Sequence, residues 1–255
     1  MIRGLYTAVS GMITQEAKQD VITNNLANVN TVGFKKDNLA VRSFENMLMQ
    51  NYDKVVGGQN VRNTIGYLNN GSKVDSVNTD FTSGTIQSTG KPTDFAIDGR
   101  GFFTVNRNGQ NYYTRDGHFH VNQEGYLVTD SGDYVSFQQN QRLFVGNNKI
   151  VCDPQGSVKL LDSNNNVVGQ DRFAAVDFDN YNNLQKIGDN LYQGNNPHAA
   201  NITVRQNSLE SSNVNTVNEM VDMITTMRTF ETNQKIVQST DETLDKVVNQ
   251  VGSVR

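Results

Sequence analysis

Hydrophobic residues follow a helical spacing at the two ends of the chain and a different pattern between them. From about Ile2 to Asn28, apolar residues recur near the i, i+3, i+4, i+7 spacing that lines one face of a helix. No proline interrupts this stretch, and Gly33 follows its expected end, where a left-handed residue is tolerated. The pattern predicts an amphipathic N-terminal helix with an apolar face of Leu5, Val9, Met12, Ile13, Ala17 and Leu26.

Beyond Asn213 the chain returns to a helical spacing. Thr216 and Glu219 are spaced as a capping box, in which each side chain satisfies a free backbone amide at the helix start. An apolar residue then recurs every seven positions, which favours coiled-coil packing. The alternate seam positions hold Thr226, Asn233 and Thr240 instead of leucine, so the seam is weak and needs further neighbours. The stripe comprises Met223, Phe230, Val237, Leu244 and Val251, widened by Met220 and Met227.

The middle of the chain divides into two regions. Residues 36 to about 90 are interrupted by glycine, asparagine and serine, which indicates an extended arm with a few short strands. From about Asp94 to Val204, short apolar runs alternate with turn residues, and Asn108-Gly109 is a strong signal for a two-residue hairpin. Frequent short strands predict a small sandwich or barrel-like β domain.

The predicted fold is therefore α+β, with long N- and C-terminal α-helices that pair as a coiled coil around an extended β-rich arm and a central all-β domain. The expected segments are an N-terminal helix with a hinge (1–35), the arm (36–90), the β domain (91–205) and the C-terminal helix (206–255).

Composition and charge exclude several classes of protein. The net charge of −4 argues against a nucleic-acid-binding face, which would be basic. No apolar stretch approaches the roughly 20 residues of a membrane span, so no membrane insertion is expected. The N-terminus lacks the features of a cleavable secretory signal. We therefore expect a cytosolic protein, or one exported by a route that reads no cleavable signal.

The residues that usually carry chemistry are better explained as structural. Cys152 is the only cysteine and is expected to be a buried thiol. His118 and His120 share a strand face but have no third ligand of fitting spacing, so solvent-facing histidines are favoured over a metal site. Asp94 and Asp98 fit turns better than acid–base catalysis. We predict no catalytic, cofactor-binding or metal-binding residues, and no enzymatic activity.

Sequence blocks in three regions of the chain, in order, resemble the flagellar basal-body rod and hook protein family. The N-terminal block comprises residues 5–12 (LYTAVSGM) and 24–35 (NNLANVNTVGFK). The β region contains 94–103 (DFAIDGRGFF), 113–117 (YTRDG) and 124–128 (EGYLV). The C-terminal block contains 209–214 (LESSNV), 219–221 (EMV), 223–224 (MI) and 228–231 (RTFE). Length and motif order are most similar to the distal-rod members, whereas the proximal-rod members share the same plan.

The resemblance implies a structural subunit of the rod in the basal body of the bacterial flagellum. It would pass through the flagellar type III export apparatus and assemble into a hollow drive shaft. Its partners would be further copies of itself, other rod proteins and the hook protein, with ring proteins as additional candidates. The apolar residues of both helices, Ala17 excepted, would form the assembly interface. The hinge and signature residues would be Asn25, Ala27, Asn28, Thr31, Gly33, Phe34 and Lys35.

Two other classes of function remain open from the residues alone. The aromatic β region is compatible with a secreted carbohydrate-binding or wall-degrading module. The terminal helices are also compatible with a secreted, adhesin-like coiled-coil protein. Release of fragments from cell wall, or surface display without any effect on motility, would distinguish these alternatives from a rod subunit.

Overall fold

The computed structural model describes residues 2–56, 59–138 and 141–251, with side chains for 3–51, 62–138 and 141–249. The chain forms two compact units, each assembled from separate stretches of sequence. Unit 1 comprises Met1–Leu26, Asp37–Asn78 and Thr216–Arg255, and unit 2 comprises Ala27–Lys36 and Thr79–Asn215. The short segment that follows the first helix therefore belongs to the β-rich unit.

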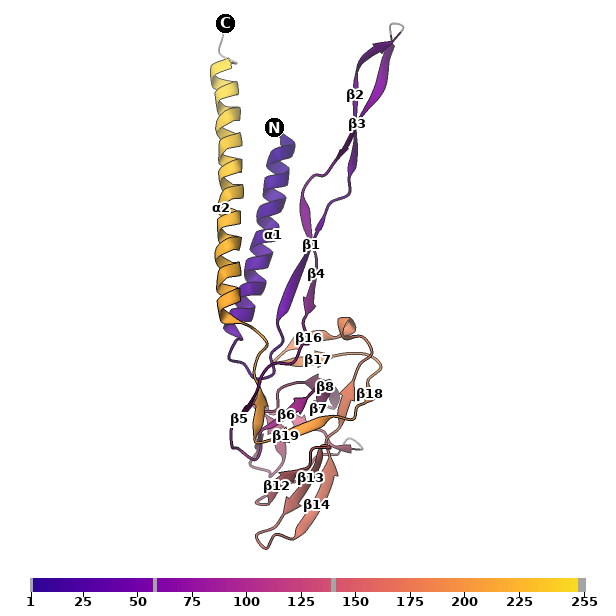
Figure 1. Ribbon diagram of the computed structural model, residues 1–255, viewed down its shortest axis with the longest axis vertical. Helices are drawn as coiled ribbons and strands as arrows, with labels where there is room; N and C mark the ends of the chain where they lie inside the picture. Colours follow the sequence, from indigo (N-terminus) through magenta and orange to yellow (C-terminus); the bar gives the residue numbers. More distant parts are fainter. Residues whose placement is uncertain (1, 57–58, 139–140, 252–255) are drawn as a thin grey trace. The chain divides into compact units, whose positions relative to one another are not determined.

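Unit 1 contains two long helices, which confirms the predicted N- and C-terminal helices. Helix α1 spans Ile2–Ala27, and α2 spans Thr216–Lys246 and continues as a π-helical turn, η3, at Val247–Val251. The helices run side by side in opposite directions (Figure 1), with Asn25 bonded to Glu219 and Gly11 beside Asn233.

The predicted coiled coil is wrong, because over the described residues α1 and α2 do not pack closely along their lengths. Where they approach, the contact is made by small and polar residues, since a Cβ on Gly11 would lie 2.9 Å from Nδ2 of Asn233. At the alternate seam positions Thr226 is buried, whereas the apolar residues of the stripe from Met220 to Leu244 are half-buried or exposed. Helix α1 also uses Thr14 to contact Ser72 of the arm (3.4 Å between hydroxyl oxygens). Polar residues at alternate stripe positions thus prevent the regular knobs-into-holes packing of a coiled coil.

The arm of unit 1 consists of two antiparallel ribbons rather than a few short strands. Strand β1 (Asp37–Ser43) pairs with β4 (Ser72–Thr79), and β2 (Met47–Val56) pairs with β3 (Gln59–Leu68). The second ribbon extends the first (Figure 1). Large apolar side chains, among them Ile65 and Tyr67, are exposed on it. A ribbon exposed on both faces needs no alternation of apolar and polar residues, which explains why the periodicity underestimated its length.

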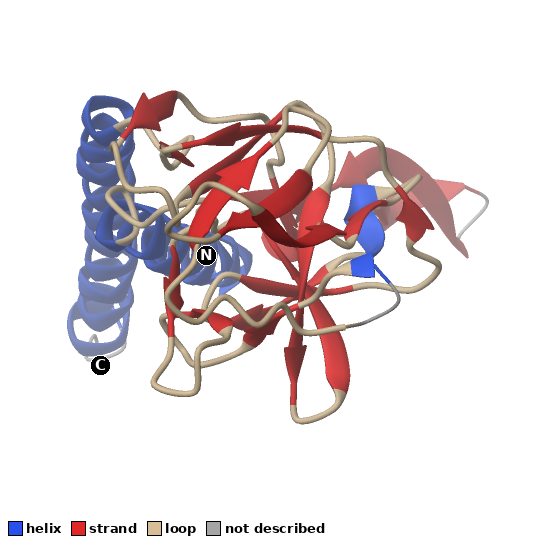
Figure 2. Ribbon diagram, turned by 90° about the horizontal axis from the view of Figure 1, so that it is seen from below, coloured by secondary structure: helices blue, strands red, loops and turns tan. Residues whose placement is uncertain are grey.

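Unit 2 is built from short antiparallel strands (Figure 2). The hairpin predicted at Asn108-Gly109 is confirmed, because β7 and β8 pair across these two residues, whose φ angles are +53° and +85°. The main sheet has the order β16-β17-β8-β7-β11-β10-β9, with β15 and β18 joined beside β7. Smaller sheets are formed by β12-β13-β14, β19-β6 and β20-β5.

The strands of unit 2 are β5 (Ile86–Ser88), β6 (Phe95–Asp98), β7 (Phe102–Arg107), β8 (Gln110–Thr114), β9 (Phe119–Val121), β10 (Leu127–Thr129), β11 (Tyr134–Val135), β12 (Lys149–Cys152), β13 (Ser157–Leu161), β14 (Val167–Arg172), β15 (Ala175–Asp177), β16 (Gln185–Gly188), β17 (Leu191–Gln193), β18 (His198–Ala199), β19 (Thr203–Gln206) and β20 (Ser208–Glu210). A short 3-10 helix, η2, spans Tyr181–Asn183.

Strand β7 separates two hydrophobic cores. Successive side chains of a strand point to opposite faces, so Phe103 enters the larger core and Phe102 the smaller one. The larger core includes Phe95, Phe119 and Phe173. The smaller core is aromatic, and Phe81 packs against it from the segment that enters the unit. This second core therefore fixes the chain at the beginning of unit 2.

Candidate functional site

The signature segment, Ala27–Lys36, is held against the rest of unit 2 by hydrogen bonds to its backbone. The Gly33 amide donates to the Glu210 carbonyl (2.8 Å), and the Val32 carbonyl accepts from Nδ2 of Asn190 (2.8 Å). Within the segment, the Thr31 amide donates to the Asn28 carbonyl (3.2 Å) and the Thr31 hydroxyl to Oδ1 of Asn28 (3.2 Å). These bonds tie a tight turn to strand β20 and to the turn before β17.

Gly33 is required by both its conformation and its surroundings. Its φ is +67°, in the left-handed region that side chains rarely adopt. A Cβ at this position would lie 2.6 Å from the carbonyl carbon of Arg115 and from the amide nitrogen of Asp116. The absence of a side chain is therefore what allows the segment to approach the β8–β9 connection.

Phe34 and Lys35 leave the turn with both side chains buried. The Lys186 ammonium lies 3.9 Å from the centroid of the Phe34 ring and donates to the Lys35 carbonyl (3.2 Å). A cation over an aromatic face is stabilised by the ring quadrupole. The exit of the segment is thus fixed by an aromatic contact as well as by hydrogen bonds.

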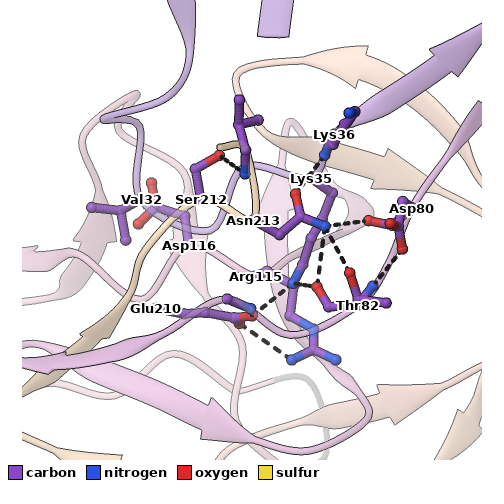
Figure 3. A network of polar contacts seen from close by, with 12 residues as sticks. Val32, Lys35, Lys36, Asp80, Thr82, Arg115, Asp116, Glu210, Ser212 and Asn213 are labelled. Atoms are coloured by element: carbon purple, nitrogen blue, oxygen red, sulfur yellow. Dashed lines mark hydrogen bonds and ion pairs between the residues drawn. The ribbon is translucent and has the colours of Figure 1, made fainter. Parts of the chain in front are cut away.

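A buried ion network surrounds the Lys35 side chain (Figure 3). Its Nζ lies 2.6 Å from Oε1 of Glu210 and donates to the Thr82 carbonyl (2.7 Å). Nη1 of Arg115 lies 3.3 Å from Oε2 of the same carboxylate, and the Gly84 amide donates to Oε1 (2.9 Å). The Lys35 and Glu210 side chains have no solvent exposure, and that of Arg115 has 1%. One carboxylate therefore holds two buried cations.

Burial lowers the pKa of Lys35, and the attraction and hydrogen bond of Glu210 oppose that shift. Nε of Arg115 has no hydrogen-bond partner among the described residues, although its guanidinium lies 5.2 Å from the centroid of the Phe102 ring. Because both cations depend on Glu210 for charge compensation, this carboxylate holds together the segments 33–35, 82–84 and 115.

Beside this network, Asn213 joins the segment at Lys36 to the segment at Asp80 (Figure 3). Its Oδ1 accepts from the Lys36 amide (2.7 Å), and its Nδ2 donates to the Asp80 carbonyl (2.8 Å). The Asp80 amide in turn donates to the Lys36 carbonyl (2.8 Å). Asn213 thus joins two stretches of the chain that lie 177 and 133 residues away from it in the sequence.

In unit 1, the buried Asn25 connects three segments. Its Oδ1 accepts from the Asp37 amide and its Nδ2 donates to the Asp37 carbonyl, both at 2.9 Å. The same Nδ2 lies 3.3 Å from Oε2 of Glu219, a buried carboxylate in the first turn of α2. Asn25 thereby joins α1, β1 and α2.

The predicted interface residues fall into three groups. Those that are half-buried are Leu5, Val9, Met12, Leu26, Met223, Phe230, Val237 and Leu244. Ile13, Met220 and Met227 are exposed. The side chain of Val251 lies outside the described residues. Among the hinge residues, Ala27 ends α1 and is exposed.

The residues missed by sequence reasoning are the partners of the signature segment. Arg115 and Glu210 lie inside family motifs, but neither was assigned a role, and Glu210 is 175 residues from Lys35. Thr82, Lys186 and Asn190 lie outside those motifs. In the sequence, the feature that could have identified Arg115 and Glu210 as functional residues is a charged side chain within a family motif.

The residues considered for chemistry have structural partners. Nδ1 of His118 lies 3.1 Å from Oδ1 of Asp94, and Nδ1 of His120 lies 3.5 Å from Oδ1 of Asp130. Burial raises the pKa of Cys152 to about 12. Within 2–56, 59–138 and 141–251, no three histidine, cysteine or carboxylate side chains are arranged to hold a metal ion. In the same ranges neither long helix is apolar enough to cross a membrane.

Asp116 makes the stability of the protein depend on pH. Burial raises its pKa to about 6, above the usual value of 3.8. The folded state thus binds a proton more tightly than the unfolded state, so this contribution is complete below about pH 4 and is lost as the pH rises through 6. We expect Asp116→Asn to be more stable than the wild type at pH 7.5 by roughly 1–3 kcal/mol, because the cost of ionising the buried carboxyl is removed.

The measurement is urea unfolding of both proteins at pH 4.5 and 7.5. Asparagine retains an acceptor for the His118 amide, which bonds to Oδ1 of Asp116 at 2.9 Å. The matched control is Asp179→Asn, since the Asp179 side chain is 98% exposed and its replacement is expected to change the free energy of unfolding by less than about 0.5 kcal/mol. Identical pH dependence in the Asp116 variant and the wild type would contradict the assignment.

Comparison with known proteins covers the same blocks that the motifs occupy. A family model described as "Flagella basal body rod protein" matches residues 5–35. One described as "Flagellar hook protein FlgE/F/G D1 domain" matches residues 96–173. A third, "Flagellar basal body rod FlgEFG protein C-terminal", matches residues 205–251. The N-terminal helix with the signature segment, the main β region and α2 thus each match a separate family model.

Relatives align over nearly the whole chain. The flagellar basal-body rod protein FlgG of Bacillus subtilis is 35% identical over 98% of this chain and 99% of its own length. FlgG of Borreliella burgdorferi is 35% identical over 96% and 97%, respectively. The flagellar basal-body rod protein FlgF of Caulobacter vibrioides is 33% identical over all of both chains. The resemblance inferred from the motifs is confirmed, and this chain belongs to the family of flagellar basal-body rod proteins.

Proposed function

We propose that copies of this chain polymerise through their terminal helices into the hollow drive shaft that carries torque from the motor to the hook. As a member of the rod family, the chain is a structural subunit of the flagellar basal-body rod. The FlgG relatives support the distal part of the rod, and the full-length match to an FlgF protein keeps the proximal part as the alternative.

The observation that carries the proposal is an apolar stripe along the first turns of α2, which we call the outer stripe. It consists of Val217, Met220, Val221, Ile224 and Met227, which are between 41% and 69% exposed. Residues at this spacing lie on one helix face. The face includes two residues of the predicted interface, whereas the half-buried members of the heptad lie on another side of the helix.

A second exposed apolar face on α1 supplies a surface to cover the outer stripe. Tyr6 and Ile13 are 65% and 58% exposed and lie seven residues apart, on one side of that helix. If the outer stripe of one copy covers this face of the next, the contact joins two different surfaces. Such heterologous contacts do not close on themselves and can grow a filament. The weak contact between α1 and α2 within one copy leaves both faces accessible for it.

The remaining partners follow from assembly outside the cytoplasm. We infer that the chain is exported by the flagellar type III apparatus, and that it contacts other rod proteins and the hook protein. Ring proteins around the rod are further candidates. The role requires no catalytic residue, and the rod family is a structural one.

Ile224→Asp tests the polymerisation step. A carboxylate in the centre of the outer stripe would be desolvated in a subunit contact, so we expect a strain carrying only this variant to lose rods and motility. Because Ile224 is exposed in the single copy, the purified variant should unfold within about 0.5 kcal/mol of the wild type. The measurements are electron microscopy of basal bodies and urea unfolding of the purified protein.

The matched control is Val168→Asp, which places the same charge on an exposed valine of β14 in unit 2. It is expected to support normal rods. If the Ile224→Asp strain formed rods of normal length, the proposal that subunits assemble through the outer stripe would be wrong.

A further inference from the structure

Unit 2 carries a small aromatic cluster that belongs to neither of its cores. The rings of Tyr126 and Phe144 have centroids 5.6 Å apart at an interplanar angle of 74°, and those of Tyr126 and Tyr134 are 6.0 Å apart. Phe144 is 57% exposed and is the one exposed aromatic side chain in the described part of unit 2. An exposed phenylalanine beside two tyrosines, which we call the Phe144 patch, contributes little to the packing of the fold.

The Phe144 patch is held in a fixed position. The amides of Val145 and Gly146 both donate to the Gly125 carbonyl, at 2.8 and 3.1 Å, so the two loops that carry the rings are joined. Gly125 has a φ of +88°, and a Cβ there would lie 2.7 Å from Cε2 of Phe144. The ring therefore rests against a glycine turn that leaves room for it. Little side-chain entropy would be lost if a ligand covered it.

Polar groups border the rings. The Arg142 guanidinium lies 3.9 Å from the centroid of the Tyr134 ring, and the Tyr134 hydroxyl donates to Oε2 of Glu124 (3.3 Å). The border thus offers a planar donor and a carboxylate acceptor beside an apolar ring. Charges of both signs are present, so a strongly charged ligand of either sign is disfavoured.

The size of the Phe144 patch favours a small ligand over a protein partner. A stable protein contact buries about 800 Å² on each side, with a cluster of apolar residues at its centre. The other large apolar side chains exposed in the described part of unit 2 are Val167, Val168 and Ile187, which lie on β14 and β16 and not in the cluster. One exposed ring with polar neighbours is instead comparable in size to a single sugar ring.

We propose that the Phe144 patch binds carbohydrate. Polarised C–H groups on one face of a pyranose ring would lie on the negative face of the Phe144 ring. The hydroxyls of the sugar would accept from Arg142 and donate to Glu124. Contact through a single exposed ring is expected to be weak, in the millimolar range of dissociation constants typical of small interfaces. This inference goes beyond assembly of the rod and does not depend on it.

The test is saturation-transfer NMR of the purified full chain with two probes, a tetramer of N-acetylglucosamine and a tetramer of glucose. We expect saturation transfer to at least one probe and a roughly tenfold loss of affinity in Phe144→Ala, since truncating a central aromatic contact commonly costs this much. Val168→Ala, at a similarly exposed position of the same unit, is the matched control and should bind as the wild type does.

Two results would overturn the proposal. The first is no transfer to either tetramer, and the second is equal binding by the wild type and Phe144→Ala. Near-UV circular dichroism of each variant checks that unit 2 stays folded, and Tyr134→Phe gives a milder change of the same cluster. If Phe144→Ala leaves sugar binding intact but weakens self-association in sedimentation, the Phe144 patch is a contact between copies and does not bind carbohydrate.

Discussion

Replacing Glu210 by alanine is expected to destabilise unit 2 by about 3–5 kcal/mol, the usual cost of removing one partner from a buried ion pair. The variant leaves the ammonium of Lys35 and the guanidinium of Arg115 buried without their shared counter-charge. It also removes the acceptor of the Gly84 amide. The measurement is urea unfolding at pH 7, monitored by near-UV circular dichroism of the aromatic cores.

The destabilisation caused by Glu210→Ala is expected to become smaller as the pH rises. Glu210 is the group that raises the pKa of Lys35 against the effect of burial, so its removal lowers that pKa further. Between this lowered pKa and the usual lysine value of 10.5, the unfolded chain binds more protons than the folded one, so stability rises with pH over that interval. Arg115 stays charged throughout, so the recovery is partial.

An exposed ion pair of the same unit provides the control for Glu210→Ala. Arg205 and Asp98 approach to 2.6 Å, but their side chains are 60% and 43% exposed. Asp98→Ala is expected to cost at most about 1 kcal/mol, because water screens such a pair. Equal losses for the two variants would show that the buried network does not hold the signature segment.

Replacing Gly33 by alanine is expected to cost about 2–4 kcal/mol, from two separate causes. The left-handed conformation costs an alanine roughly 1–2 kcal/mol. The remainder comes from the Cβ, which would lie 2.6 Å from backbone atoms of Arg115 and Asp116 and would force the segment away from them. Urea unfolding gives the sum of both effects.

Gly90→Ala separates the two causes, since Gly90 has a φ of +74° with open space where its Cβ would lie. This control is expected to show the conformational cost alone. If Gly33→Ala lowered the free energy of unfolding no more than Gly90→Ala does, the close approach to the Arg115 backbone would contribute nothing to the cost. In a cell, we expect Gly33→Ala to reduce the number of complete rods, because subunits with an undocked segment are less stable.

The elements that sequence predicted well are those specified by neighbouring residues. Helix α1 follows from its spacing of apolar residues, the beginning of α2 from Thr216 and Glu219, and the β7–β8 hairpin from Asn108-Gly109. Each signal acts over a few residues, through a periodic face or a preferred φ angle. The order of the motif blocks was sufficient to identify the family.

The pairing of helices was not predictable in this way. A heptad shows which face of α2 is suited to a partner but not which partner covers it. Thr226 and Asn233 signalled a weak seam, and the structure has Thr226 buried and Asn233 beside Gly11 in place of a coiled coil. Similarly, none of the described side chains on the two ribbons of the arm is buried, so no apolar periodicity revealed the length of these strands.

For the signature segment, the sequence by itself determined the residues and the tertiary structure determined their partners. Gly33, Phe34 and Lys35 were recognisable from their type and position at the end of α1. Whether that segment is a free hinge or a docked one depends on Glu210 and Arg115. Glu210 lies 175 residues from Lys35 and 95 residues from Arg115 in the sequence. A buried charge must find its counter-charge wherever the fold brings one within reach, and sequence spacing does not encode that distance.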